Sequence, residues 1–386
     1  MWTRIDSATR VLPAPLAAVD LQALEANADD LIRRARGVPI RVATKSVRCR
    51  AVLERTLARP GYAGLMAYSL AEAVWLVEQG ASDVLVAYPS VDRESFRRIG
   101  ADEHLAREIT VMVDDPQHLA LIAGAVEPGA HPVRVCLDID ASLRIGPLHL
   151  GVRRSPVHTV EQAVSAARGI VREPAVRLVG IMFYDAQLAG VPDRSPAVRA
   201  MKARSVRELA GRRPRIVEAV RAVTPIELVN GGGTGSLHLV ADDDCLTEVA
   251  AGSGLFGPTL FDGYRDFTPR PALAYALPVT RRPAPDVRTL FGGGYVASGP
   301  AGESRVPTPF LPAGLGLIGT EGVGEVQTPV TGPAAAALAV GDRVWWRHAK
   351  AGEICERFTA LHLVAGGDIP TVTAVPTYRG EGQCFG

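Results

Sequence analysis

The sequence predicts a (β/α)8 barrel of parallel strands followed by a smaller, mainly β domain. Between residues 17 and 270, short apolar runs rich in Val and Ile alternate with longer amphipathic stretches, which is typical of parallel βα units. There are eight such runs, the number that closes a barrel. Their continuous apolar character fits strands that are buried on both faces. An open doubly wound sheet is the alternative.

The predicted elements follow from local pattern. Residues 17–36 carry apolar side chains close to a 3.6-residue period, which indicates a helix. Ser69 and Glu72 form a capping-box pattern that opens a helix running to Gln79, and Gly80 ends it. Helices over 158–172 and 198–223 continue the series. The eight predicted barrel strands are 38–44, 62–67, 82–87, 109–113, 133–139, 176–183, 226–230 and 245–250.

After about residue 270 the pattern changes, because Pro and Gly interrupt short strand-like pieces and no helical period survives outside 334–339. Gly341-Asp342 reads as a hairpin turn. The first dozen residues also look extended, so we expect 1–16 to join this region. The predicted domains are therefore a barrel over 17–270 and a β-rich domain over 271–386 with 1–16. The predicted strands are 274–279, 289–295, 315–319, 343–347, 361–364 and 371–375.

The composition excludes several classes of protein. The chain has 386 residues, 47% hydrophobic and 22% charged, which is an ordinary globular mixture. A net charge of +1 argues against a nucleic-acid partner. Without a long apolar run we expect no membrane partner, and the N-terminus does not resemble a signal peptide. Five scattered cysteines favour reduced thiols and a cytoplasmic location.

Lysine is scarce, and its positions are informative. Only three of the 42 basic residues are lysines, namely Lys45, Lys202 and Lys350. Arginine carries charge equally well, but it cannot form the carbon–nitrogen double bond that a lysine amine forms. Lys45 ends the first predicted strand, at the rim where barrels hold their active sites. Chance survival of a few lysines is the alternative.

A glycine-rich loop follows the seventh predicted strand, at residues 230–236 (NGGGTGS). Glycines let backbone N–H groups approach an anion, and the following helix would add its dipole. Barrels often bind phosphate with the loops after strands seven and eight, and Gly252-Ser253-Gly254 follows the eighth. A plain tight turn is the alternative. A phosphate loop and Lys45 on one rim indicate a Schiff base to pyridoxal 5′-phosphate (PLP), although Lys45 would also serve as a counter-charge.

Four segments resemble a known group of enzymes: 41–46 (RVATKS), 83–89 (DVLVAYP), 138–146 (DIDASLRIG) and 230–235 (NGGGTG). They are similar to the fold type III PLP-dependent enzymes, which have an alanine-racemase-like N-terminal domain. Within that group they resemble the D-threonine aldolase and D-serine dehydratase branch. A C-terminal domain with a histidine near its end, here His348, adds to the resemblance, which covers nearly the whole chain in order.

The resemblance implies roles for individual residues. Lys45 would hold the cofactor and transfer a proton on one face. Gly232, Gly233, Thr234 and the turn of Gly252, Ser253 and Gly254 would hold the phosphate. Arg144 would face the pyridine nitrogen, with a structural ion pair to Asp138 or Asp140 as the alternative. Tyr184 would lie near the cofactor ring, with simple packing as the alternative.

The chain departs from the family pattern at two places. Gln187 stands where relatives often have a histidine, and an amide cannot exchange a full proton. Relatives bind a divalent metal ion through a histidine, here His348, and a Cys or Asp two positions on. Lys350 stands in that second place, and a protonated amine is no metal ligand. Glu353 or Cys355 would have to replace Lys350 as the second metal ligand. Alternatively, the ammonium of Lys350 would itself supply the positive charge that the metal gives in relatives.

The resemblance implies a PLP-dependent lyase that acts on a β-hydroxy-α-amino acid of D configuration, by aldolase or dehydratase chemistry. His348 would act as the catalytic base toward the β-hydroxyl, with or without a metal. The alternative is a PLP-dependent racemase. By analogy with relatives we expect a homodimer. Arg153 and Arg154 would meet a substrate carboxylate or would be surface charge, and the sequence favours neither.

Overall fold

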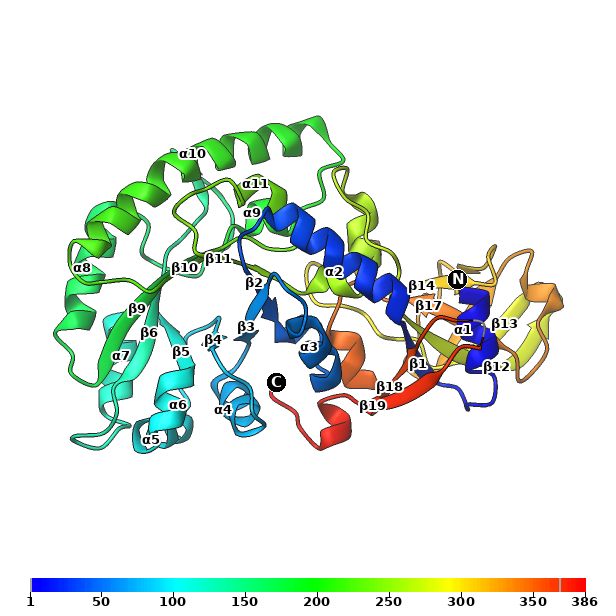
Figure 1. Ribbon diagram of the computed structural model, residues 1–386. Helices are drawn as coiled ribbons and strands as arrows, with labels where there is room; N and C mark the ends of the chain where they lie inside the picture. The colour runs from blue at the N-terminus through cyan, green and yellow to red at the C-terminus, as the bar shows by residue number, and fades with distance from the viewer. Residues whose placement is uncertain (1, 368) are drawn as a thin grey trace. The chain divides into compact units, whose positions relative to one another are not determined.

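The computed structural model describes residues 2–367 and 369–386, and the chain divides into two compact units, shown in one ribbon diagram in Figure 1. Each unit contains pieces from distant parts of the chain. The first comprises the N-terminal residues up to Asp30, Ser46–Glu54 and Ser253–Cys384. The second comprises Leu31–Lys45, Arg55–Gly252 and Phe385–Gly386.

The second unit is a closed barrel of eight strands in the order β10-β11-β2-β3-β4-β5-β6-β9, and every neighbouring pair is parallel. All eight predicted barrel strands are confirmed, and the open sheet is wrong. The strands are β2 (Ile40–Ala43), β3 (Tyr62–Ala67), β4 (Val84–Val86), β5 (Ile109–Val113), β6 (Val133–Asp138), β9 (Val176–Phe183), β10 (Leu228–Gly231) and β11 (Glu248–Ala251).

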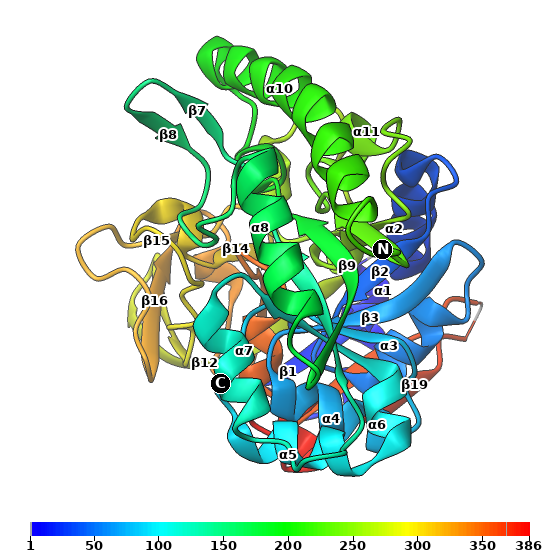
Figure 2. The same ribbon diagram turned by 90° about the vertical axis from the view of Figure 1, so that its left-hand side faces the viewer.

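Helices follow most of the barrel strands. At the start of α4 the Ser69 hydroxyl accepts a hydrogen bond from the Glu72 N–H at 3.2 Å, as the capping pattern predicts. The long helix α10 runs beside α8 (Figure 2). The α-helices of the chain after the first are α2 (Leu21–Ala35), α3 (Arg50–Leu57), α4 (Leu70–Glu78), α5 (Arg93–Ala101), α6 (Glu103–Glu108), α7 (Pro116–Ala123), α8 (Val160–Val171), α9 (Ala186–Ala189), α10 (Pro196–Arg221) and α11 (Leu237–Val240).

The barrel is filled by side chains rather than by solvent. Successive strands contribute one buried apolar cluster to its interior, and Tyr88 and Tyr184 pack against it from the loops that follow β4 and β9. Such a core fixes the strand ends relative to one another. The cluster consists of Met66, Leu85, Ala87, Met112, Cys136, Met182, Leu228 and Ala250.

Charged groups close the amino-terminal end of the barrel. The buried Arg41 guanidinium lies 2.7 Å from the Glu248 carboxylate and 2.9 Å from that of Asp83. Gly64 has a φ of +70°, and a Cβ at this position would lie 2.3 Å from Arg41 Nη1. Only glycine fits there, because the guanidinium occupies the space and the backbone is left-handed. This ion network therefore stabilises the end of the barrel opposite to the candidate site.

The first unit is built on a mixed sheet in the order β15-β16-β13-β12-β1-β18-β19, to which β17 and β14 are added through β12. The six predicted strands are present, with shifted ends, and β14 and β16 are additional. Both contain a proline, which weakens the strand signal in a sequence. The strands are β12 (Leu273–Ala284), β13 (Val287–Phe291), β14 (Thr308–Leu311), β15 (Gly316–Leu317), β16 (Gln327–Thr331), β17 (Arg343–Arg347), β18 (Ala360–Val364) and β19 (Val372–Pro376).

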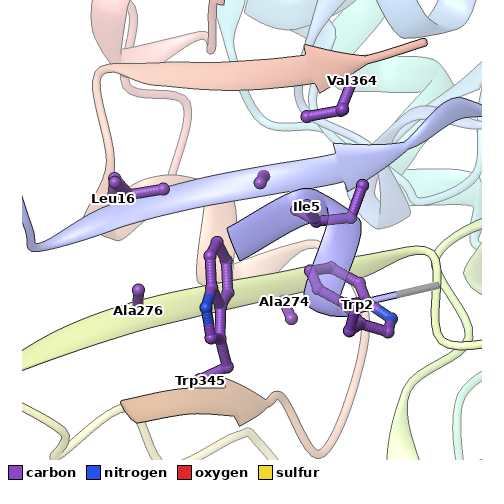
Figure 3. Close-up of a cluster of buried hydrophobic side chains, with 8 residues drawn as sticks. Trp2, Ile5, Leu16, Ala274, Ala276, Trp345 and Val364 are labelled. Carbon is purple, nitrogen blue, oxygen red and sulfur yellow. The ribbon is translucent and has the colours of Figure 1, made fainter. Parts of the chain in front are cut away.

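Two predictions for the N-terminal segment are wrong. The segment expected to be extended forms α1 (Trp2–Ala8), and the helix expected from residue 17 is preceded by β1 (Leu16–Asp20), between β12 and β18. Trp2 and Ile5 are buried in an apolar cluster with Trp345 and residues of β1, β12 and β18 (Figure 3). In this N-terminal segment, burial against the sheet therefore determines the local structure, and the 3.6-residue spacing of apolar side chains from residue 17 does not.

None of the helices within the described residues is both long enough and apolar enough to cross a membrane.

Replacement of Arg41 by methionine should strongly destabilise the barrel. The substitution keeps the volume of the aliphatic stem but leaves the Glu248 carboxylate buried without its cation, which costs about 3 to 5 kcal/mol. Urea unfolding measures this change. Arg97→Met removes an exposed ion pair within α5 and is the control, expected to unfold like wild type. Equal stability of the two variants would contradict a stabilising role for the network.

Candidate active site

Lys45 lies at the carboxyl-terminal rim of the barrel, in the short 3-10 turn Thr44–Ser46 that directly follows β2. The Thr44 hydroxyl donates to the carbonyl of Met66 on the neighbouring strand at 3.0 Å, which fixes the turn. The Lys45 side chain is exposed, and its Nζ donates to the Tyr88 hydroxyl at 2.6 Å. Tyr88 follows β4, so residues from two strand ends meet at this amine.

The Tyr88 phenol is electrostatically perturbed. Burial raises its pKa, but the positive charges of Lys45 and Arg154 outweigh that effect, so the pKa lies below its ordinary value. A phenol with a lowered pKa that touches an amine is suited to share a proton with it. Tyr88 directly follows the third predicted strand and lies in the segment 83–89 that carries the family resemblance, but the sequence assigns it no role. Its place at a strand end, like that of Lys45, was the available signal.

Arg154 contacts two aromatic rings of the rim. Its guanidinium carbon lies 5.6 Å from the centroid of the Tyr88 ring and 5.1 Å from that of Tyr184. Burial raises the pKa of Tyr184, and the charges of Lys45 and Arg154 oppose that change. Tyr184, Tyr88, Arg154 and Lys45 therefore form one group at the rim.

An acidic side chain interacts electrostatically with Arg154 of this group. Asp138 ends β6 and is buried, and this burial, together with the nearby Asp114, raises the pKa of its carboxyl to about 8. Arg154 favours the charged form but does not compensate. The Asp138 carboxyl is therefore largely protonated at neutral pH and presents a hydrogen-bond donor.

Arg144 lies on β7 (Leu143–Ile145), which forms a small hairpin with β8 (Leu148–Leu150) that projects from the barrel in Figure 2. Its guanidinium pairs with Asp140 at 2.5 Å. Burial acts to raise the pKa of Asp140, but hydrogen bonds from Ser142 and Arg144 hold it below its usual value. The ion pair considered from the sequence is thus present, and 41% of the Arg144 side chain stays exposed.

The glycine loop is shaped for an anion. Gly232 has a φ of +76°, and a Cβ at Gly233 would lie only 2.7 Å from that of Ala189. Within the residues that the structure describes, the N–H groups of Gly233 and Gly235 donate to no acceptor. Unpaired backbone donors at a glycine-rich turn suit a phosphate group. The following helix, α11, is a single turn, so its dipole adds less than the sequence suggested.

Buried polar contacts hold this loop in place. The Ser236 hydroxyl donates to the carboxylate of Asp185 at 3.0 Å, and Arg34 donates to the Thr234 carbonyl at 2.6 Å. Burial raises the pKa of Asp185 to about 6, against the charge of Arg213 and the Ser236 hydrogen bond. Gly252, which follows β11, directs its N–H toward the Thr234 hydroxyl at 3.5 Å. Asp185 follows the sixth predicted strand, but nothing in its local pattern, or in that of Arg34, indicates a contact with the loop.

Gln187 has a structural contact of its own. Its buried amide Nε2 donates to the carbonyl of Ala141 at 2.7 Å, while its Oε1 has no partner among the described residues. The contact joins the segment after β9 to that after β6.

His348 belongs to the first unit, immediately after β17. The ring is buried, and neither ring nitrogen has a hydrogen-bond partner among the residues described. Burial, reinforced by the charge of Arg347, lowers the pKa of the imidazole to about 3, and the backbone of Leu273 opposes this weakly. The imidazole is therefore neutral, and a ring nitrogen keeps a lone pair that can accept a hydrogen bond or bind a ligand. Ser253 and Gly254 also belong to this unit, in the 3-10 turn Ser253–Leu255.

The residues around His348 do not fit the family's metal site. Lys350 donates to the carbonyl and the hydroxyl of Ser298, both at 3.1 Å. Glu353 accepts from the Ser298 N–H at 2.9 Å, and Cys355 is buried. Throughout the described part of the chain, no three His, Cys, Asp or Glu side chains converge as metal ligands. We therefore derive no step through a metal.

A protein-family model matches the part of the chain that contains this arrangement. The model described as "Alanine racemase, N-terminal domain" matches residues 19–259, which is more than half of the chain. The chain belongs to this family. The match includes the barrel strands, Lys45 and the glycine loop, so the resemblance stated from the sequence is confirmed.

Curated members of the family are similar to this chain. A 3-hydroxy-D-aspartate aldolase from Paracoccus denitrificans is 26% identical over 248 residues, covering 64% of this chain and 60% of the relative. The alignment thus spans less than two thirds of that relative. A D-threonine aldolase from an Arthrobacter species is 25% identical over 295 residues, covering 75% of this chain and 72% of the relative.

Solved structures share the fold. The crystal structure of D-threonine aldolase from Filomicrobium marinum superimposes with a TM-score of 0.79 at 23% identity, covering 96% of each chain. D-threo-3-hydroxyaspartate dehydratase from Delftia sp. HT23 gives 0.72 at 20% identity, covering 95% of this chain and 98% of that one. Alanine racemase from Clostridium difficile gives 0.65 at 14% identity, covering 95% and 99%.

Replacement of Asp138 by asparagine should flatten the pH dependence of stability. Because the folded-state pKa of Asp138 is raised to about 8, the native protein keeps a proton that the unfolded chain releases near pH 4. The wild type should therefore lose up to about 1.4 kcal/mol per pH unit from this group between pH 4 and 8. Urea unfolding at several pH values measures the slope, and identical slopes for the variant and the wild type would contradict the assignment.

Proposed function

We propose that this protein is a PLP-dependent lyase that cleaves β-hydroxy-α-amino acids of D configuration, by aldolase or dehydratase chemistry. The observation that carries the proposal is the exposed Lys45 amine at the barrel rim, 2.6 Å from the Tyr88 hydroxyl. The named relatives support the reaction class, because the curated ones are aldolases of D-amino acids. Alanine racemases match the fold at lower identity, so racemisation is less supported.

The residues present fit PLP. Lys45 supplies the amine to which this cofactor attaches. Gly232, Gly233 and Thr234 would hold the phosphate, because this loop offers unpaired N–H donors where a side chain at Gly233 would clash. We propose that Gly252, Ser253 and Gly254 complete that phosphate site. Tyr184 would pack on the cofactor ring. Arg144 would face the pyridine nitrogen, which requires its guanidinium to turn at least partly away from Asp140.

Bound PLP would withdraw the electrons released when a bond at the substrate Cα breaks. The chain's residues control the protons of that reaction. Lys45 Nζ would hold and transfer a proton on its side of the substrate Cα. Tyr88 accepts a hydrogen bond from this Nζ and keeps it oriented. The protonated Asp138 carboxyl adds no negative charge to the site.

The β-hydroxyl needs a base for the aldol cleavage or a general acid for elimination. His348 stays our predicted catalytic base for the aldol cleavage, because a neutral imidazole has a lone pair that can take the β-hydroxyl proton. The family resemblance implies a divalent metal ion with His348 as its first ligand, but Lys350 and Glu353 contact Ser298 instead, so the proposed mechanism includes no metal. We also propose a homodimer and a cytoplasmic location, by analogy with related enzymes.

A substrate panel tests the proposed reaction. The purified protein loaded with PLP should convert D-threonine, D-serine or 3-hydroxy-D-aspartate, with release of an aldehyde by aldol cleavage or of ammonia and a keto acid by elimination. The L enantiomers should not react. Lys45→Arg keeps the charge but removes the amine and should abolish turnover. Formation of the opposite enantiomer, without aldehyde or keto acid, would instead identify a racemase.

Replacement of His348 by alanine should lower kcat by at least about 100-fold, because a general acid or base contributes that much. The visible absorbance of the bound cofactor should be unchanged. Turnover at the wild-type rate would remove His348 from the mechanism.

Dialysis against a chelator is the companion measurement. Because Lys350 occupies the place of the second metal ligand, the wild type should keep its activity. Loss of activity that Mn²⁺ restores would show that His348 acts through a metal.

A further inference from the structure

Arg154 differs from its neighbour Arg153 in its surroundings. Both are exposed and lie between β8 and α8. The Arg154 guanidinium lies over the rings of Tyr88 and Tyr184, 5.6 and 5.1 Å from their centroids. Contacts of a guanidinium with two aromatic faces orient it without neutralising its charge. Among the residues that the structure describes, no aromatic ring contacts Arg153 in this way.

The charge of Arg154 is not balanced by an acid. Among the residues that the structure describes, no carboxylate lies within ion-pair distance of Arg154, whereas Arg144 pairs with Asp140 at 2.5 Å. The acid that Arg154 influences is Asp138, whose carboxyl stays largely protonated at neutral pH because it is buried. Arg154 lowers the pKa of the Tyr88 phenol through its charge and a hydrogen bond. A guanidinium carries five N–H donors, so Arg154 can still bind an anion from solution.

The same tyrosine links this arginine to the reactive amine. Tyr88 accepts a hydrogen bond from Lys45 Nζ, and that nitrogen lies 5.3 Å from the centroid of the ring on which Arg154 also lies. A ligand whose amine replaces that of Lys45 would extend toward this arginine. The planar guanidinium fork matches a carboxylate with two parallel hydrogen bonds.

Building on the proposed function, we propose that Arg154 binds a carboxylate of the amino-acid substrate. The site would thus hold the substrate at two points, with its amine at Lys45 and a carboxylate at Arg154. The carboxylate belongs either to the Cα or to the side chain of a β-hydroxy amino dicarboxylic acid. Either carboxylate would form the same hydrogen bonds with the guanidinium. The two cases differ in which substrates need Arg154 for binding.

Binding and kinetics of Arg154→Gln and Arg154→Lys test the proposal, with Arg153→Gln as the matched control. Loss of one charge-assisted contact should weaken binding by about 10- to 100-fold. D-alanine and D-aspartate serve as probes, because neither has a β-hydroxyl to lose, and their binding to the PLP-loaded protein is followed by the change in visible absorbance. The lysine variant should recover part of the loss, and Arg153→Gln should match the wild type.

The pattern of losses identifies the carboxylate. Equal weakening for both probes assigns Arg154 to the carboxylate on Cα, and a larger loss for D-aspartate assigns it to the side chain. Wild-type affinity of Arg154→Gln for both probes would overturn the proposal, as would loss of cofactor from that variant. These titrations need no turnover, so they test the role of Arg154 separately from the proposed reaction. A protein that binds both probes but cleaves no substrate would contradict the proposed lyase activity, and the binding data would still decide the role of Arg154.

Discussion

Closure of eight parallel strands is the constraint on which the site depends. In a closed parallel barrel the carboxyl-terminal ends of all strands meet at the same rim. The fold itself therefore brings together residues that are far apart in the sequence. Lys45 follows β2, Tyr88 follows β4 and Tyr184 follows β9, yet these residues form one group with Arg154. The ion pairs of Arg41 lie at the opposite, amino-terminal end of the barrel. They therefore do not neutralise the charges of Lys45 and Arg154 at the rim.

Electrostatics then distinguishes the residues of the rim. Two cations, Lys45 and Arg154, act on the Tyr88 phenol and lower its pKa although the group is partly buried. The nearby Asp138 responds in the opposite direction and keeps its proton, so it does not cancel them. The result is a group of side chains at the rim with a positive charge, which would suit the anionic substrate and the cofactor that we propose.

Much of this arrangement was predictable from the sequence. Continuous apolar runs located all eight barrel strands, because a strand buried on both faces has a strong signal. The scarcity of lysine drew attention to Lys45, and three successive glycines marked the loop after β10. The strand β1 was mistaken for the start of a helix, since its burial depends on partners that are more than 250 residues away in the sequence. The contacts of Asp185 and Arg34 with the loop could not be predicted for the same reason, because they exist only in the folded chain. The sequence left Arg153 and Arg154 equivalent, and the two tyrosine rings distinguish them.

We propose that Lys45 is the residue to which PLP attaches. Borohydride reduction of the PLP-loaded protein, followed by proteolysis and mass spectrometry, tests this attachment directly, because the chain has only three lysines. We expect a phosphopyridoxyl group on the peptide that contains Lys45 and on no other. A label on Lys202 or Lys350, or no label at all after reduction in the presence of excess PLP, would contradict it.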